Sequence, residues 1–315
     1  MPATARHTTS RRSPTALLDR AAPALALALL AGCATPGAAQ ERPAPSPPAA
    51  GQALAPAGPT YAELVELGRA AQITLIAAVA DQARVPPERA PGLEPGKVRL
   101  YLEAETETLL AGRSAIGQSL AFLADRDLDA RGRVPDLEEE RYLLFAQAVP
   151  GRAGEIQLVS PAAMLPASPE LVERARLVLR QIAEGPPLPQ VTGVREAISV
   201  PGNLAGESET QLFLETAGGE PVSLTVLRRP GMAPEWGVSW TDIVDPAAHP
   251  AQPETLAWYG LACSLPRDLP DNAFLQAEAE AQARAREDYA FILGELGECA
   301  RSPSTAPTPS AGQTP

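Results

Sequence analysis

Residues 73–79 of this 315-residue chain read Ile73-Thr74-Leu75-Ile76-Ala77-Ala78-Val79, and this stretch decides the fold of the first part of the molecule. Apolar or small side chains occupy both sets of alternate positions, so an extended segment would present apolar side chains on each face. The stretch therefore predicts a strand that is buried on both faces.

The segments before and after this strand predict the layers around it. Thr60 and Glu63 have the spacing of a capping box, which predicts a short helix carrying Tyr61, Leu64 and Leu67. Residues 98–105 alternate between apolar and polar side chains, which is typical of a half-exposed strand.

Two more strands and a helix complete the first unit. The strands are predicted at 142–149 and 155–159, and 170–183 has the spacing of an amphipathic helix. Ser168-Pro169 precedes that helix and Gly185-Pro186 follows it, as expected of helix ends. Residues 60–185 are therefore predicted to form a small sheet closed by a helix.

A proline-rich boundary at Pro186, Pro187 and Pro189 separates a second predicted unit, residues 186–299. Residues 209–216 and 221–229 predict a hairpin around Gly218-Gly219. A further strand carries Trp236, Val238 and Trp240 on one face, and another strand is predicted within 256–265. A long helix is predicted from Phe274 to Leu296, with Asp271 as its N-cap and Gly297 at its C-terminal end. The predicted fold class is α+β, with small mixed or antiparallel sheets, each packed by an amphipathic helix.

The N-terminal segment has the features of an export signal. Residues 1–20 carry four Arg and one Asp, and 21–32 form an apolar run that is too short to span a bilayer. Residues 33–59 are rich in Pro and Ala and predict a disordered tether, and residues 300–315 predict a disordered tail. Removing residues 1–32 takes away four Arg and one Asp, so the net charge changes from -12 to -15.

Leu30-Ala31-Gly32-Cys33 matches the lipobox, and over these residues the chain resembles bacterial lipoproteins. The resemblance implies cleavage before Cys33 and lipid chains on that residue, so the membrane is an expected partner. A plain secretory signal with an incidental Cys33 is the alternative. Ala34 follows the anchor where an Asp would hold an enterobacterial lipoprotein at the inner membrane, which implies a periplasm-facing protein of the outer membrane.

The other two cysteines, Cys263 and Cys299, predict a disulfide because an even pair in an exported chain is expected to oxidise. Cys299 continues the apolar face of the terminal helix, and Cys263 ends the apolar segment on which that helix would pack. A redox pair or a metal site is the alternative interpretation, although neither Cys lies in a C-x-x-C motif.

The aromatic residues of the second unit suggest one possible ligand surface. Trp236, Trp240, Trp258 and Tyr259 could stack on sugars, and Arg228-Arg229 could bind a carboxylate or a phosphate. The sequence favours core packing of the rings, and a solubilising strand end for the arginines, over this ligand surface.

No catalytic or metal motif stands out in the sequence. Asp125, Asp127, Asp129 and Asp136 have the spacing of calcium ligands, but Ala130 stands where the calcium loop needs glycine. His249 lies in a predicted loop, and no catalytic serine motif or nucleotide fingerprint is found. No cofactor is expected, and the acidic balance argues against nucleic acid as a partner.

Two functions follow as hypotheses. The leading one is a non-enzymatic lipoprotein of the cell envelope that binds a protein partner or peptidoglycan. The alternative is a hydrolase of envelope glycans that uses carboxylates among Glu207, Glu209, Asp242 and Asp245, which lie near the tryptophans in the sequence. The segments 201–210 and 258–263 resemble uncharacterised exported proteins of G+C-rich proteobacteria, a resemblance that implies no activity.

Overall fold

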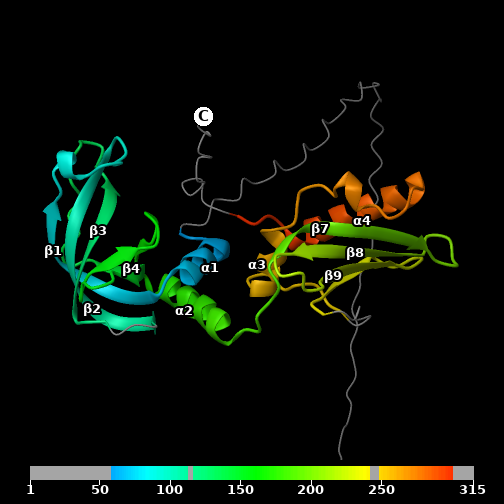
Figure 1. Cartoon of the computed structure of the whole chain (residues 1–315), viewed down its shortest axis with the longest axis horizontal. Coiled ribbons are helices and arrows are strands. Elements are labelled where there is room, and N and C mark those ends of the chain that lie inside the picture. The colour runs from blue at the N-terminus through cyan, green and yellow to red at the C-terminus, as the bar shows by residue number, and fades with distance from the viewer. Residues whose placement is uncertain (1–57, 113–115, 242–247, 301–315) are drawn as a thin grey trace, which may run out of the picture. The chain divides into compact units, whose positions relative to one another are not determined.

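The computed structural model of the protein describes residues 58–112, 116–241 and 248–300 (Figure 1). These residues form an α+β structure with four α-helices and two antiparallel sheets among the described segments. The predicted signal peptide, Cys33, the tether and the tail lie outside them. Every helix in the described ranges is too short or too polar to cross a lipid bilayer.

The first sheet contains six strands, of which the first three form an antiparallel meander. The strands are β1 (Ile73–Arg84), β2 (Lys97–Gly112), β3 (Ser119–Asp127), β4 (Arg141–Ala148), β5 (Ile156–Leu158) and β6 (Met164–Pro166). Their order is β3-β2-β1-β4-β5. β6 also pairs with β4, at residues 142–144, whereas β5 pairs with residues 146–148. Register shifts at three places in the β1–β2 ladder allow these long strands to bend.

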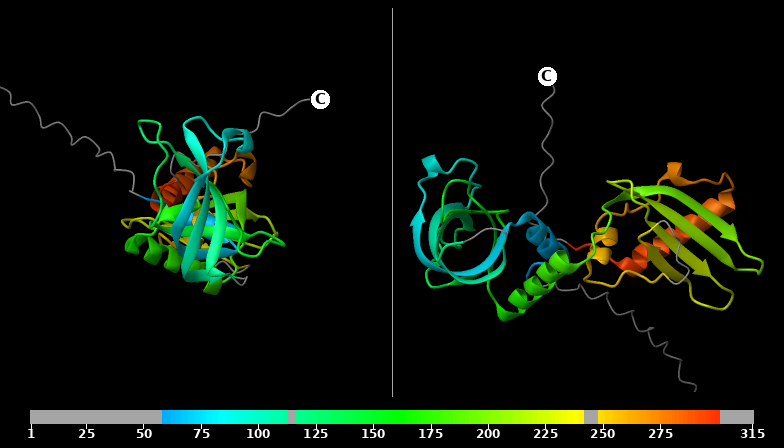
Figure 2. Two further views of the ribbon diagram at one scale, coloured as in Figure 1. Left: turned by 90° about the vertical axis from the view of Figure 1, so that its left-hand side faces the viewer. Right: turned by 60° about the horizontal axis from the view of Figure 1, so that its bottom comes forward.

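The two ends of the first sheet meet, so that the sheet closes into a barrel. Ala121 on β3 forms a parallel bridge with Glu155, next to β5, and its N–H donates to the carbonyl of Gly154 at 2.8 Å. The strands curve around a common interior (Figure 2). The buried side chains inside are Ile73, Leu75, Ala77, Val79, Val98, Leu100, Leu102, Ala104, Leu120, Phe122, Ala124, Leu137, Leu144, Ala146, Ile156 and Met164.

Two helices cover the outer face of β1 and β4. Helix α1 (Tyr61–Ala70) has the predicted capping box, in which the Thr60 N–H donates to the Glu63 carboxylate at 2.7 Å. Helix α2 (Pro169–Glu184) starts after Ser168 as predicted. Leu75 lies in the barrel core and Ile76 in the cluster under the helices, so the predicted burial of both strand faces is confirmed.

The second sheet contains four strands in the order β10-β9-β8-β7, all antiparallel. The strands are β7 (Val191–Pro201), β8 (Ser208–Thr216), β9 (Ser223–Arg228) and β10 (Glu235–Ser239). The predicted β8–β9 hairpin is confirmed, and Gly219 in its turn has a φ of 80°, a conformation that favours glycine. Helix α4 (Ala279–Leu296) lies along one face and buries Ala285, Tyr289 and Ile292 (Figure 2).

The apolar segment 256–265 was predicted as a strand, and this prediction is wrong. It forms helix α3 (Leu256–Ala262), because the Thr255 hydroxyl accepts from the N–H of Trp258 and caps a helical first turn. Short apolar runs fit a buried strand and a buried helix equally well, so the periodicity alone could not separate the two.

The start of the terminal helix was also predicted too early. Residues 271–273 form a short 3-10 helix, η2 (Asp271–Ala273), and α4 begins only at Ala279. Between them the chain runs along β7, where the Leu275 N–H donates to the Ala197 carbonyl at 3.1 Å. The predicted stop at Gly297 is confirmed by its φ of 71° at the C-cap. The apolar spacing at 274–278 therefore reflects packing against a strand edge.

Candidate binding groove

The four predicted ligand-binding rings all take part in packing. Trp236 is 6% exposed in the core of the second sheet, and Trp240 packs partly buried against the same core. Trp258 donates from Nε1 to the Leu296 carbonyl at 2.8 Å, and the Arg69 guanidinium lies 5.2 Å from the centre of the Tyr259 ring. The contacts of these rings match the core-packing interpretation.

The two predicted anion-binding arginines differ in their surroundings. Arg228 lies 2.5 Å from Asp288 through Nε and 3.1 Å from Glu287 through Nη2, so its half-buried guanidinium is already paired with two carboxylates. Arg229 pairs with Glu235 on the surface at 2.8 Å. Neither geometry creates a site that is open to an anion.

The carboxylates of the hydrolase hypothesis do not form a facing pair among the described residues. Glu207 accepts from the N–H groups of Asn203 and Leu204 at 2.9 and 3.1 Å, so it stabilises the loop between β7 and β8. Glu209 accepts from the side chain of Gln211. Asp242 and Asp245 lie outside the described residues.

Two of the four aspartates with calcium-ligand spacing are engaged by arginines. Asp125 lies on β3 and pairs with Arg99, whereas Asp129 accepts from the N–H groups of Arg131 and Arg133, each at 2.8 Å. The hydrogen bond from the Arg133 amide is the main cause that lowers the pKa of Asp129. Within the described ranges, no group of three or more His, Cys, Asp or Glu side chains could hold a metal ion. The carbonyl of His249 accepts from the N–H of Val238 at 3.2 Å.

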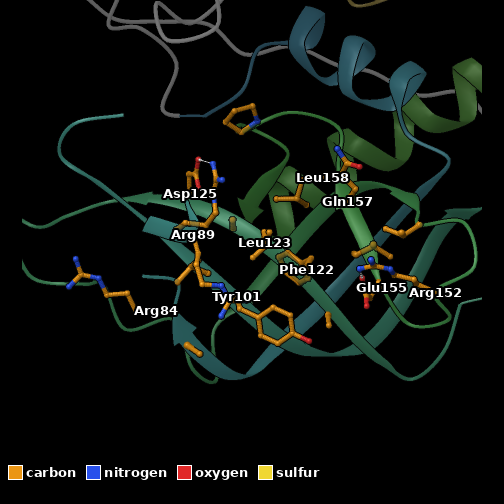
Figure 3. Close-up of a pocket in the computed structure, with 18 of the residues that line it drawn as sticks. Arg84, Arg89, Tyr101, Phe122, Leu123, Asp125, Arg152, Glu155, Gln157 and Leu158 are labelled. Carbon is orange, nitrogen blue, oxygen red and sulfur yellow. Dashed lines mark hydrogen bonds and ion pairs between the residues drawn. The ribbon is translucent and has the colours of Figure 1, made fainter. Parts of the chain in front are cut away.

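A large concave feature lies on the barrel and was not predicted from the sequence. It is a cavity of about 990 Å³, which we call the barrel groove (Figure 3). Three parts of the barrel line it: the outer face of β2 and β3, the connection after β1, and the segment around β5. The lining residues used below are Arg84, Arg89, Arg99, Tyr101, Leu123, Asp125, Arg152, Glu155 and Leu158.

The floor of the groove is an exposed cross-strand pair. Tyr101 on β2 and Leu123 on β3 are directly opposite each other, and they are 41% and 51% exposed. The next pair along the same face is Arg99 and Asp125, joined by two hydrogen bonds of 2.7 and 2.8 Å. The groove thus has an apolar patch beside a neutralised ion pair.

The groove has an excess of positive charge in an acidic protein. Four arginines line it against two acids, while the whole chain has a net charge of -12. Arg99 pairs with Asp125, and Arg152 pairs with Glu155 at 3.0 Å. Arg84 and Arg89 make no ion pair or hydrogen bond through their side chains with other residues that the structure describes. These two exposed guanidinium groups are therefore available to an anionic ligand.

A second cavity of about 360 Å³ lies next to the barrel groove. The two share Val149, Arg152, Glu155 and Ile156 in and after the connection between β4 and β5. Ile73, Ile116 and Leu120 contribute apolar side chains to the wall of the second cavity, beside the polar side chains of Arg152 and Glu155. A ligand that fills the groove therefore has a second cavity within reach at its Arg152 end.

Cys263 and Cys299 are joined in a disulfide, with Cα atoms 5.0 Å apart. The bond links the C-cap of α3 to the residues that follow α4. Neither cysteine lines the barrel groove or the second cavity.

The sequence contains only a weak signal for the groove. Tyr101 stands at an outward position of the alternating stretch 98–105, where an aromatic side chain on a polar face can mark a binding surface. Arg84, Arg89 and Leu123 come from separate segments, and no local pattern joins them. No protein-family model and no curated protein matches this chain.

Proposed function

We propose that this protein is a non-enzymatic binding protein of the bacterial cell envelope, anchored by lipid on Cys33, and that its barrel groove holds a segment of a protein partner. The lipobox and the Pro-rich tether support the location. The barrel groove is the observation that carries the binding role, because it combines an exposed apolar floor with two arginines that form no ion pair within the described part of the chain.

The order of strand pairing supports this choice of site. β1 pairs with β2 and β4, β2 with β3, and β4 with β5, while β3 and β5 are joined by a parallel bridge. This is the connectivity of the five-stranded OB barrel, whose second and third strands, with the loops after the first and fourth strands, form a face that binds oligonucleotides and oligosaccharides in such proteins. The barrel groove lies on that face and is bordered by those two loops.

The composition of the groove favours a polypeptide over the other ligands that such barrels bind. Stacking of sugars or bases needs several exposed rings, and Tyr101 is the one ring with its side chain exposed in the lining. A peptide with an apolar side chain and a nearby carboxylate fits the groove, because the apolar side chain can contact Tyr101 and Leu123 while the carboxylate lies near Arg84 and Arg89.

Position-specific crosslinking in cells tests this function. A photoreactive amino acid replaces Leu123 in the full-length lipoprotein, and a matched variant carries it at Leu204, which is 63% exposed in the loop between β7 and β8. We expect a protein adduct from position 123 that protease removes and that position 204 does not form. An adduct that only glycan-cleaving enzymes remove, or the same adducts from both positions, would contradict the proposal.

A further inference from the structure

The strand β3 has one open edge, and this edge borders the barrel groove. On its other side β3 pairs with β2 along its whole length. On the groove side, Ala121 alone forms a bridge, to Glu155. The edge from Leu123 onward has no strand partner among the described residues.

The direction of the backbone groups on this edge follows from the alternation along a strand. The Ala121 N–H donates away from β2, to Gly154, so the N–H groups of Leu123 and Asp125 point to the same side. Their side chains share the outer face with Tyr101, which lies opposite Leu123. Leu123 thus offers an amide donor and an exposed apolar side chain to the same occupant.

In the second sheet, a chain segment covers part of the β7 edge, whereas β10, like β3, has one backbone hydrogen bond on its outer edge among the described residues. Residues 274–276 run along β7, where the Leu275 N–H donates to the Ala197 carbonyl. On β10 the Val238 N–H donates to the His249 carbonyl. Proteins usually protect exposed strand edges, because an open edge pairs readily with another chain. The open edge of β3 therefore needs an explanation.

We infer that the partner segment binds as an added, acidic strand along β3, an inference that rests on the proposed function and specifies its ligand. The backbone of the segment pairs with Leu123 and Asp125, as in other cases of strand addition. One of its apolar side chains contacts Tyr101 and Leu123, and its carboxylates lie near Arg84 and Arg89. Asp125 on this edge is already paired with Arg99, so its carboxylate does not compete with those of the segment.

A designed peptide tests the strand and its charge together. The probe is a fluorescent octapeptide of alternating glutamate and valine, titrated with the full mature lipoprotein in detergent micelles and followed by anisotropy. Two matched peptides carry lysine in place of glutamate, or N-methyl groups on alternate amides that remove the donors on one edge. We expect saturable binding of the acidic peptide and at least about tenfold weaker binding of each matched peptide.

Protein variants assign the contacts. Leu123→Pro removes the amide donor on the open edge, a position at which proline is tolerated, and Leu123→Ala keeps that donor. The double change Arg84→Glu and Arg89→Glu reverses the local charge, and Arg180→Glu is the control on α2, where the exposed Arg180 makes no ion pair among the described residues. We expect Leu123→Pro to bind about tenfold more weakly than Leu123→Ala, and the double variant about tenfold more weakly than the control.

Hydrogen exchange on the unaltered protein keeps the test valid if a variant fails to fold. Binding of the acidic peptide should slow exchange of the Leu123 and Asp125 amides. Unchanged exchange there, equal binding of the N-methylated peptide, or tighter binding of the lysine peptide overturns the inference. So does the absence of saturable peptide binding, or displacement of the peptide by a chitin-type oligosaccharide or a single-stranded oligonucleotide. A protein adduct at position 123 would then still support the proposed function, which separates the two failures.

Discussion

The carboxylate of Asp288 is fully buried, and its partners join α4 to three strands of the second sheet. Thr210 on β8 donates a hydrogen bond to it, and Arg228 on β9 lies 2.5 Å away. The hydroxyls of Thr210 and Ser199 lie 2.9 Å apart, which extends the network to β7. A buried charge of this kind is tolerated because it is paired and hydrogen-bonded, and removing one partner leaves it uncompensated.

Replacing the arginine of this pair should therefore be costly. We expect Arg228→Met to lower the free energy of unfolding by about 2–4 kcal/mol, since Asp288 would remain buried without its cation. Arg229→Met, one residue further on, removes a surface pair with Glu235 and should cost less than about 1 kcal/mol. Urea unfolding of both variants gives the comparison, and equal costs would show that the buried pair does not stabilise the fold.

Tyr61 predicts a change in stability at alkaline pH. Burial raises the pKa of its hydroxyl from the ordinary value of 10.0 to about 12, and the hydroxyl donates to Gln181 at 2.5 Å. Because the pKa is higher in the folded state, this contribution to stability is complete below about pH 10 and disappears as the pH rises through 12.

The variant Tyr61→Phe isolates that contribution. The free energy of unfolding of the unaltered protein should exceed that of the variant at pH 8, and the difference should shrink as the pH rises from 10 to 12. Urea unfolding at several pH values measures it. Tyrosinate absorbance should also show the ionisation of one tyrosine near pH 12 that the variant lacks. A difference independent of pH would contradict the raised pKa.

Among the elements, those with caps at both ends were the most predictable from the sequence. Ser168-Pro169 and Gly185 predicted both ends of α2 to within a residue, because caps satisfy helix-end groups through local contacts. Strands β3 and β7 were not predicted. Asp125 has calcium-ligand spacing to Asp127 and Asp129 in the sequence, but it lies within β3 and pairs across the strands with Arg99. Local spacing does not show that a charged side chain will pair with a residue far away in the sequence, as Asp125 does with Arg99.

The disulfide joins the C-cap of α3, the helix that had been predicted as a strand, to the residues that follow α4. The two cysteines are 36 residues apart in the sequence. In the chain-entropy model, closing a loop of that length contributes about 4 kcal/mol to stability. Reduction should therefore lower the urea midpoint of the unaltered protein.

The double variant Cys263→Ala and Cys299→Ala provides the control, because its midpoint should not respond to reductant. Intact mass of the exported protein, with and without reductant and an alkylating reagent, counts the thiols. Two alkylated cysteines without reductant would contradict a bridge in the native protein.

For the whole molecule, the lipid anchor is the prediction with the clearest chemical test. If Cys33 carries lipid, the unaltered protein should incorporate labelled palmitate and sediment with membranes. Cys33→Ala should lose the label and stay in the unprocessed or soluble fraction. A labelled Cys33→Ala protein, or an unlabelled protein cleaved at another position, would show that the lipobox match is incidental.

The sequence by itself determined the α+β class, the start of α1, both ends of α2, the β8–β9 hairpin and the pairing of Cys263 with Cys299, because periodicity, caps, turn residues and cysteine number are local or countable features. Tertiary structure alone decided that β1 to β5 close into a barrel, that Trp236 packs in a core, and that Arg84, Arg89 and Leu123 meet at one groove. The physical reason is that strand pairing and burial depend on contacts between segments far apart in the chain, whose energies no local pattern records.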